Sequence, residues 1–127
     1  MPVARRIYQA IEPVGIVDAE AALERNDPAE LSLVAIGVGL YSDDLAWSED
    51  FCLRLAQHPD PGVRGNAVLS FGHLSRRFKA LNRPESVGAI RRGLADAHEY
   101  VRGHAYEAAD TVEWFTKLKV RLPGGVT

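Results

Sequence analysis

Cysteine is almost absent from the sequence: Cys52 is the single one, so the chain cannot form an internal disulfide. Long apolar runs are missing as well. The most apolar stretch, residues 33–41, is far shorter than the roughly 20 residues that a membrane-spanning helix needs. Residues 1–15 lack the apolar segment of a secretory signal, because charged and polar side chains interrupt them. We therefore expect a cytoplasmic protein with no membrane segment.

An excess of charge of either sign is also lacking. Fifteen Lys and Arg residues against seventeen Asp and Glu residues give a formal charge of −2, so no overall field favours nucleic acid or an anionic membrane. The composition, 46% hydrophobic and 25% charged, is that of a folded globular protein. A length of 127 residues fits a single domain with its own core.

Two short helices are predicted at the N-terminus. The first lies around residues 7–11 and cannot continue past Pro13, because proline clashes with the preceding helical turn. The second is expected over residues 18–25, with Asp18 as its N-cap. We expect residues 1–25 to cap one end of the fold.

The next helix is predicted to begin at Asp27 and to reach about Tyr41. Pro28 suits the first helical position, and Glu30 can reach back to the cap backbone, which would complete a capping box. Apolar spacings of three and four residues predict the helices that follow, one of them over residues 61–78. Their apolar stripes are Trp47, Phe51 and Leu55; Val63, Ala67, Phe71, Leu74 and Phe78; Val87, Ile90 and Leu94; and Val101, Ala105, Ala108, Val112 and Phe115.

An internal repeat is the most informative feature of the sequence. The motif Val-Arg-Gly-x-Ala occurs at residues 63–67 and again at 101–105, which places Arg64 and Arg102 thirty-eight positions apart. That separation is close to the period of about 40 residues found in HEAT arrays. A weaker third copy is predicted at residues 27–40.

The repeat resembles the HEAT pattern, in which a turn with an acidic residue precedes Val-Arg and small residues follow along the second helix of each pair. The resemblance implies an all-α fold, a short right-handed α-α superhelix of HEAT-like helical pairs with N-terminal capping helices. We expect one domain over residues 1–127, with the cap in 1–25, stacked pairs in 27–118 and a tail, frayed at its end, in 119–127. His58 departs from the pattern, because the family often has aspartate there, as Asp96 does in the next copy.

A narrower resemblance covers residues 44–115, which are similar to a group of small bacterial HEAT-like proteins. The similar sequence segments are Trp47 to Cys52-Leu53, His58-Pro59-Asp60-Pro61 to Val63-Arg64-Gly65, Gly72-His73-Leu74, and Tyr100-Val101-Arg102-Gly103. Several members of that group are encoded beside polymorphic or contact-dependent toxins and are taken to be immunity proteins. The resemblance implies a protein that binds and blocks a partner protein, such as a cognate toxin domain.

Catalytic chemistry is not indicated by the residues. The histidines at 58, 73, 98 and 104 lack the spacing of a zinc site. The glycines are not followed by the Gly-Lys-Ser/Thr ending of a phosphate-binding loop. Cys52 is expected to be a packing residue. No paired carboxylates and no nucleophile with its base stand out, which disfavours an enzyme resembling the HEAT-like lyases or glycosylases. We expect no enzyme activity, no metal and no cofactor.

A basic cluster leaves a second function open. Arg76, Arg77, Lys79 and Arg83 surround one helix end, and Arg91 and Arg92 add to the cluster. Positive charge at a helix C-terminus complements the helix dipole, so a solvated helix end explains the cluster without a partner. The alternative is a HEAT-like nucleic-acid-associated module or a general scaffold protein, although the overall charge disfavours nucleic acid.

Two further groups of residues are predicted to contact a protein partner. Asp43, Asp44, Glu49 and Asp50 gather around Trp47 and Tyr41, where they could meet a basic toxin, or could instead serve as helix caps and core packing. The second helices of successive pairs should line one concave face. The predicted partner-binding residues are Tyr41, Asp43, Asp44, Trp47, His73, Arg77, His104, Glu107 and Trp114.

Overall fold

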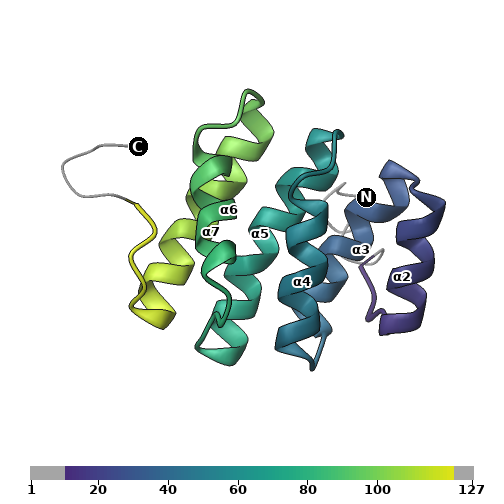
Figure 1. The fold of residues 1–127 in the computed structure, drawn as a ribbon, viewed down its shortest axis with the longest axis horizontal. Coiled ribbons are helices and arrows are strands. Elements are labelled where there is room, and N and C mark those ends of the chain that lie inside the picture. The colour runs from purple at the N-terminus through teal and green to yellow at the C-terminus, as the bar shows by residue number, and fades with distance from the viewer. Residues whose placement is uncertain (1–10, 122–127) are drawn as a thin grey trace, which may run out of the picture.

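Six α-helices and no strand make up residues 11–121, the part of the chain that the computed structural model describes. They are α2 (Ile16–Arg25), α3 (Pro28–Tyr41), α4 (Leu45–Leu55), α5 (Pro61–Phe78), α6 (Pro84–Leu94) and α7 (Glu99–Thr116). Consecutive helices run antiparallel and form three stacked pairs, α2/α3, α4/α5 and α6/α7 (Figure 1). The predicted all-α fold of stacked helical pairs is confirmed. The helix predicted at residues 7–11 lies almost wholly outside the described residues.

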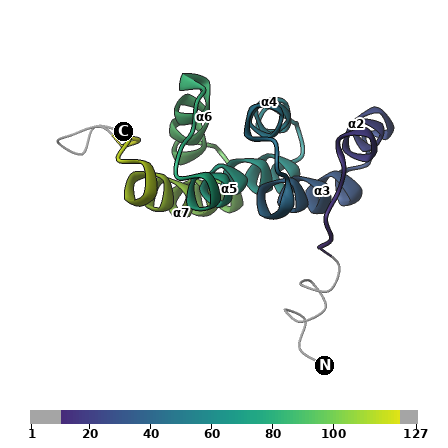
Figure 2. The same ribbon diagram turned by 90° about the horizontal axis from the view of Figure 1, so that it is seen from below.

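The pairs are arranged in two layers (Figure 2). The helices α3, α5 and α7 lie side by side in one layer, and α2, α4 and α6 lie in the other. Small residues allow the close approach within the first layer. A Cβ atom at Gly72 of α5 would lie 3.3 Å from the Cα atom of Ala108 in α7, so a larger residue there would push the two helices apart.

The core follows the predicted apolar stripes. All predicted members of the α5 and α7 stripes are buried except Phe78 and Phe115, which are half-buried near the helix ends. Leu31 and Ala35 of α3 are buried too, as the weaker third copy of the repeat predicts. Side chains from all three pairs therefore join in one continuous core, which a single pair could not form alone.

Aspartate caps explain where three helices begin. Asp27 accepts a hydrogen bond from the Glu30 amide at 3.1 Å, and Asp44 and Asp60 cap α4 and α5 in the same way. Two predicted details are wrong. Asp18 lies inside the first turn of α2, which begins after Gly15, so it is not the N-cap. The Glu30 carboxylate pairs with Arg25 at 2.7 Å instead of completing a capping box.

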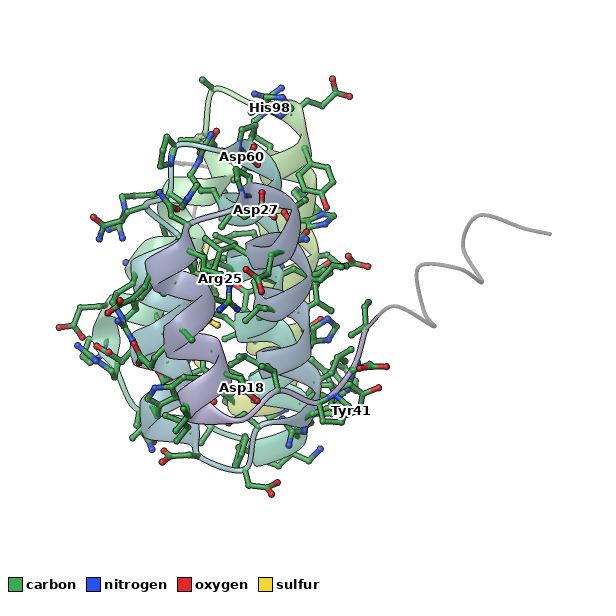
Figure 3. All side chains as sticks on the ribbon, turned by 90° about the vertical axis from the view of Figure 1, so that its right-hand side faces the viewer. Asp18, Arg25, Asp27, Tyr41, Asp60 and His98 are labelled. Atoms are coloured by element: carbon green, nitrogen blue, oxygen red, sulfur yellow. The ribbon has the colours of Figure 1, made fainter. Side chains whose placement is uncertain are left out.

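The repeated Val-Arg motif has the same local structure in both copies. Arg64 Nη1 donates to the carbonyl oxygens of His58 and Pro59, and Arg102 Nη1 donates to those at the equivalent positions, Asp96 and Ala97. These bonds hold the turn within each pair. The three turns lie in a row along one edge of the molecule, where Figure 3 labels Asp27, Asp60 and His98, whereas Tyr41 lies toward the opposite edge.

Helix α6 is rotated relative to its prediction. Its buried residues are Ser86, Ala89, Ile90 and Gly93, whereas Val87 and Leu94, expected to face inward, are only half-buried. The rotation brings the Ser86 hydroxyl to the buried carboxylate of Glu49, 2.6 Å away. A buried carboxylate must be hydrogen-bonded, and this requirement outweighs the apolar preference of Val87.

The described part of the predicted tail packs against the last pair. Val120 is fully buried, and Arg91 Nε of α6 donates to its carbonyl oxygen at 2.6 Å. Arg121 forms ion pairs with Asp110 and Glu113 of α7. Residues 117–121 therefore cover the open end of the stack. None of the helices described has both the length and the apolar character needed to cross a membrane.

Candidate partner-binding surfaces

One exposed face of α7, together with a neighbouring side chain of α5, carries several of the predicted partner-binding residues. Tyr100, His104, Glu107 and Trp114 follow one another at spacings of four, three and seven residues, which places them on the same side of the helix. The buried stripe of α7 occupies the opposite side. We call these four residues and His73 of α5 the α5–α7 face. Trp114 is its most prominent member, with 73% of its surface exposed.

The centre of the α5–α7 face is uncharged at neutral pH. Burial, followed by the positive charges of Arg76, His104 and Arg77, lowers the pKa of His73 to about 4. Burial also lowers the pKa of His104, partly offset by Glu107. The Tyr100 ring lies 4.2 Å from the His104 ring, and its hydroxyl donates to Asn66 at 2.6 Å. The face therefore offers neutral rings held in defined positions.

Tyr41 and Asp43 form a second exposed group, at the C-terminal end of α3. Tyr41 is 45% exposed and the Asp43 side chain is fully exposed. Arg77 of α5 is half-buried beneath them and donates to the carbonyl oxygens of Gly39 and Ser42, at 3.0 and 2.7 Å. Arg77 thus satisfies the free carbonyls at the end of α3. A hollow of about 410 Å³ adjoins this group, lined by Pro13, Val14, Gly15, Ile16, Tyr41, Ser42, Asp43 and Asp44.

Trp47 lies on α4, in the layer opposite α5 and α7 (Figure 2), and the predicted residue Asp44 directly precedes that helix. Its indole Nε1 donates to Glu20 at 3.0 Å, and its ring stacks on Phe51 with centroids 5.0 Å apart. Asp44 caps α4 by accepting from the Trp47 amide at 2.9 Å. Helix capping and packing therefore account for both residues without a partner.

Glu49 is not part of an acidic surface, and that prediction is wrong. The side chain is fully buried, and its carboxylate accepts hydrogen bonds from the amides of Asn82 and Arg83 and from the Ser86 hydroxyl. These donors belong to the first residues of α6 and the loop before it, so Glu49 supplies from α4 the cap that Arg83 does not provide. Glu49 therefore links the second pair to the third.

The basic cluster is largely engaged within the chain. The Lys79 ammonium lies 4.3 Å from the centroid of the Phe115 ring, and Arg83 pairs with Asp50 at 3.0 Å. Arg77 and Arg91 bind backbone carbonyls, as described above. Arg76 and Arg92 are exposed. Much of the positive charge is thus divided among separate intramolecular contacts.

Sequence reasoning missed two exposed aromatic residues of α7. Tyr106 is 59% exposed and Tyr100 is 41% exposed. The signal was present in the sequence, because both tyrosines lie outside the predicted apolar stripe of the helix. The Tyr106 ring lies 5.4 Å from the guanidinium carbon of Arg121, on the side of α7 that residues 117–121 cover.

No group of three His, Cys, Asp or Glu residues within residues 11–121 could hold a metal ion. Cys52 is buried, and burial, followed by the charge of Glu49, raises the pKa of its thiol to about 12. A thiol with so high a pKa carries almost no thiolate at neutral pH. Cys52 is therefore a packing residue, as predicted.

Comparison with known proteins identifies one similar fold. No protein-family model matches the sequence, and a search of curated proteins finds no match. A chain from "Crystal structure of CDI complex from Cupriavidus taiwanensis LMG 19424" has a similar structure, with a TM-score of 0.71. The match covers 81% of this chain and 91% of that chain at 21% sequence identity. At this identity the likeness concerns the fold.

Proposed function

We propose that the protein is a HEAT-like immunity protein, which binds a toxin domain in the cytoplasm and blocks it without catalysing a reaction. The observation that carries the proposal is the presence of exposed aromatic side chains on α7, of which Trp114 is the most exposed. Tryptophan and tyrosine are enriched among the residues that contribute most to protein–protein binding, whereas exposing them without a partner is unfavourable.

The fold supports the class of partner. CDI is the usual abbreviation for contact-dependent inhibition, in which a toxin acts on neighbouring cells and an immunity protein protects its producer. The similar chain comes from a CDI complex. The resemblance of residues 44–115 to HEAT-like immunity proteins, which rests on the sequence alone, favours the same role.

The α5–α7 face suits binding by burial and shape. Trp114 and Tyr100 supply large apolar surfaces, while the neutral rings of His73 and His104 cost less to remove from water than charged rings would. Glu107 supplies one exposed negative charge beside them. We propose that the α5–α7 face covers the surface through which the toxin acts. Tyr41 and Asp43 would contact the toxin at the edge of the interface.

The test uses the product of a toxin gene adjacent to the gene for this protein. Co-expression should protect cells from that toxin, and the purified proteins should bind more tightly than micromolar. Trp114→Ala should weaken binding at least about 30-fold, as truncation of a tryptophan that anchors an interface does. Val17→Ala, at an 80% exposed apolar residue of α2, should leave affinity unchanged. Absence of both protection and micromolar binding would refute the proposal.

A further inference from the structure

A groove lies between the α4 side and the α6 side of the molecule. These two helices belong to the layer opposite the α5–α7 face (Figure 2). Its volume is about 800 Å³, and α5 contributes Arg64 to its lining. The other lining residues are Leu53, Ala56 and Gln57 from the α4 side, with Arg83, Glu85, Arg92 and Asp96 from the α6 side. Pockets of this size accommodate several side chains of a ligand.

Within residues 11–121, one ion pair joins α4 to the start of α6 near one end of the groove, and a second joins α5 to the turn after α6. Arg83 pairs with Asp50 where α6 begins, and Arg64 pairs with Asp96 just after α6 ends. The gap between α2 and α4 is different, since Glu20 spans it to Trp47 and to Arg54.

Gly88 lies on α6 between Glu85 and Arg92, two residues that line the groove. A Cβ atom added there would meet Arg92 Nη1 at 3.5 Å, and no other heavy atom outside its own helix turn lies within 4 Å. The opposite wall presents the half-buried side chains of Leu53 and Ala56. The α4 wall of the groove is therefore partly apolar.

The balance of charge in the groove selects an acidic occupant. Arg64 is neutralised by Asp96 at 2.7 Å, and Arg83 lies between Asp50 and Glu85. No ion pair within residues 11–121 joins Arg92 to a carboxylate. One guanidinium with five donors thus faces the groove beside an apolar wall.

We propose that this groove binds an acidic loop of a protein partner, with an Asp or Glu carboxylate on Arg92 and a neighbouring apolar side chain against Leu53 and Ala56. A nucleic acid fits less well, because the groove leaves one arginine, Arg92, without a carboxylate, whereas a phosphate backbone is bound by several positive charges. The groove is a second interaction surface. It lies in the other layer from the α5–α7 face and does not depend on the proposed role in immunity.

The test is a titration of the ¹⁵N-labelled full chain with the peptide acetyl-Leu-Asp-Leu-amide, followed by NMR. The amide signals of Leu53, Ala56, Gly88 and Arg92 should shift and saturate at millimolar peptide. The matched peptide acetyl-Leu-Asn-Leu-amide should bind at least about fivefold more weakly, because it lacks the charge. Equal binding of the two peptides, or shifts that map to α7, would overturn the proposal.

Variants of the chain complete the test. Arg92→Glu should abolish the preference for the acidic peptide, and Gly88→Leu should reduce the shifts by placing a side chain against the guanidinium of Arg92. Gly103→Leu is the matched control, because Gly103 is a helical glycine of α7 with open space around it, and its variant should bind the peptide like the original chain. Each variant should keep the helical circular dichroism spectrum. Unchanged shifts in Gly88→Leu, or larger shifts with a thymidine tetranucleotide than with the acidic peptide, would contradict an acidic protein loop.

Discussion

Arg64 and Asp96 form a bidentate ion pair, with two hydrogen bonds, between the second and third helical pairs. Arg64 Nε donates to Asp96 Oδ2 at 2.7 Å, and Nη2 donates to Oδ1 at 2.9 Å. The remaining nitrogen of the same guanidinium holds the turn before α5. One arginine of the repeated motif therefore stabilises its own pair and also fixes the position of the next.

Replacing Asp96 by asparagine should lower the free energy of unfolding by about 2 kcal/mol at pH 7. The hydrogen bonds from Arg64 lower the pKa of Asp96 from its usual value near 3.8 to about 2, and the side chain is only 14% exposed. Because the folded pKa is the lower one, this stabilisation is present above pH 4 and is lost as the pH falls toward 2.

Urea unfolding of Asp96→Asn and the original protein, followed at several pH values between 7 and 2, measures this effect. Asp43→Asn is the control, since its side chain is fully exposed and should change the free energy by less than about 0.5 kcal/mol. A difference between Asp96→Asn and the original chain that persists undiminished at pH 2 would rule out the ion pair as its cause.

Two glycines of the third pair should respond to alanine in opposite directions. A Cβ at Gly93 would lie 2.8 Å from Ala105 Cβ and 3.4 Å from Val68 Cγ1, so Gly93→Ala should destabilise the fold by about 1 to 3 kcal/mol. A Cβ at Gly103 would meet nothing within 4 Å, and Gly103→Ala should stabilise by about 0.5 to 1 kcal/mol. Thermal unfolding of both variants gives the two signs, and a Gly93→Ala variant at least as stable as the original chain would mean that α6 and α7 do not approach as closely as described.

His73 should make the fold less stable in weak acid. Burial lowers its folded pKa to about 4, so the unfolded chain takes up a proton as the pH falls below about 6.5 while the folded chain does not. Stability is therefore full above pH 6.5 and decreases toward pH 4, by about 2 to 3 kcal/mol from this residue. In His73→Gln the decline between pH 6.5 and 4.5 should be shallower. Parallel curves for the two proteins would show that His73 is protonated in the fold.

The sequence predicts the helices well where local signals agree. Asp60 and Pro61 begin α5, the apolar stripe continues to Phe78, and the helix has those bounds. The sequence predicts Asp18 as a cap because aspartate is a common one, yet Ile16 and Val17 extend α2 upstream of it. Local helix propensity cannot show whether α2 begins after Gly15 or at Asp18, because the choice depends on how the helix packs.

The candidate site could be predicted only in part. Helical spacing places His104, Glu107 and Trp114 on one face. The roles of Glu49 and Arg77 depend on partners more than 30 residues away, so no local pattern shows that one is a buried cap and the other binds the end of α3. The α4–α6 groove likewise depends on the spacing of two helices in space.

Hydrogen–deuterium exchange of the protein alone and bound to its toxin tests the central claim most directly. The account predicts that binding slows exchange in α7 and in the part of α5 around His73, with α2 unchanged. Protection confined to α2 and α4, or equal exchange with and without the toxin, would contradict a partner-binding role for the α5–α7 face.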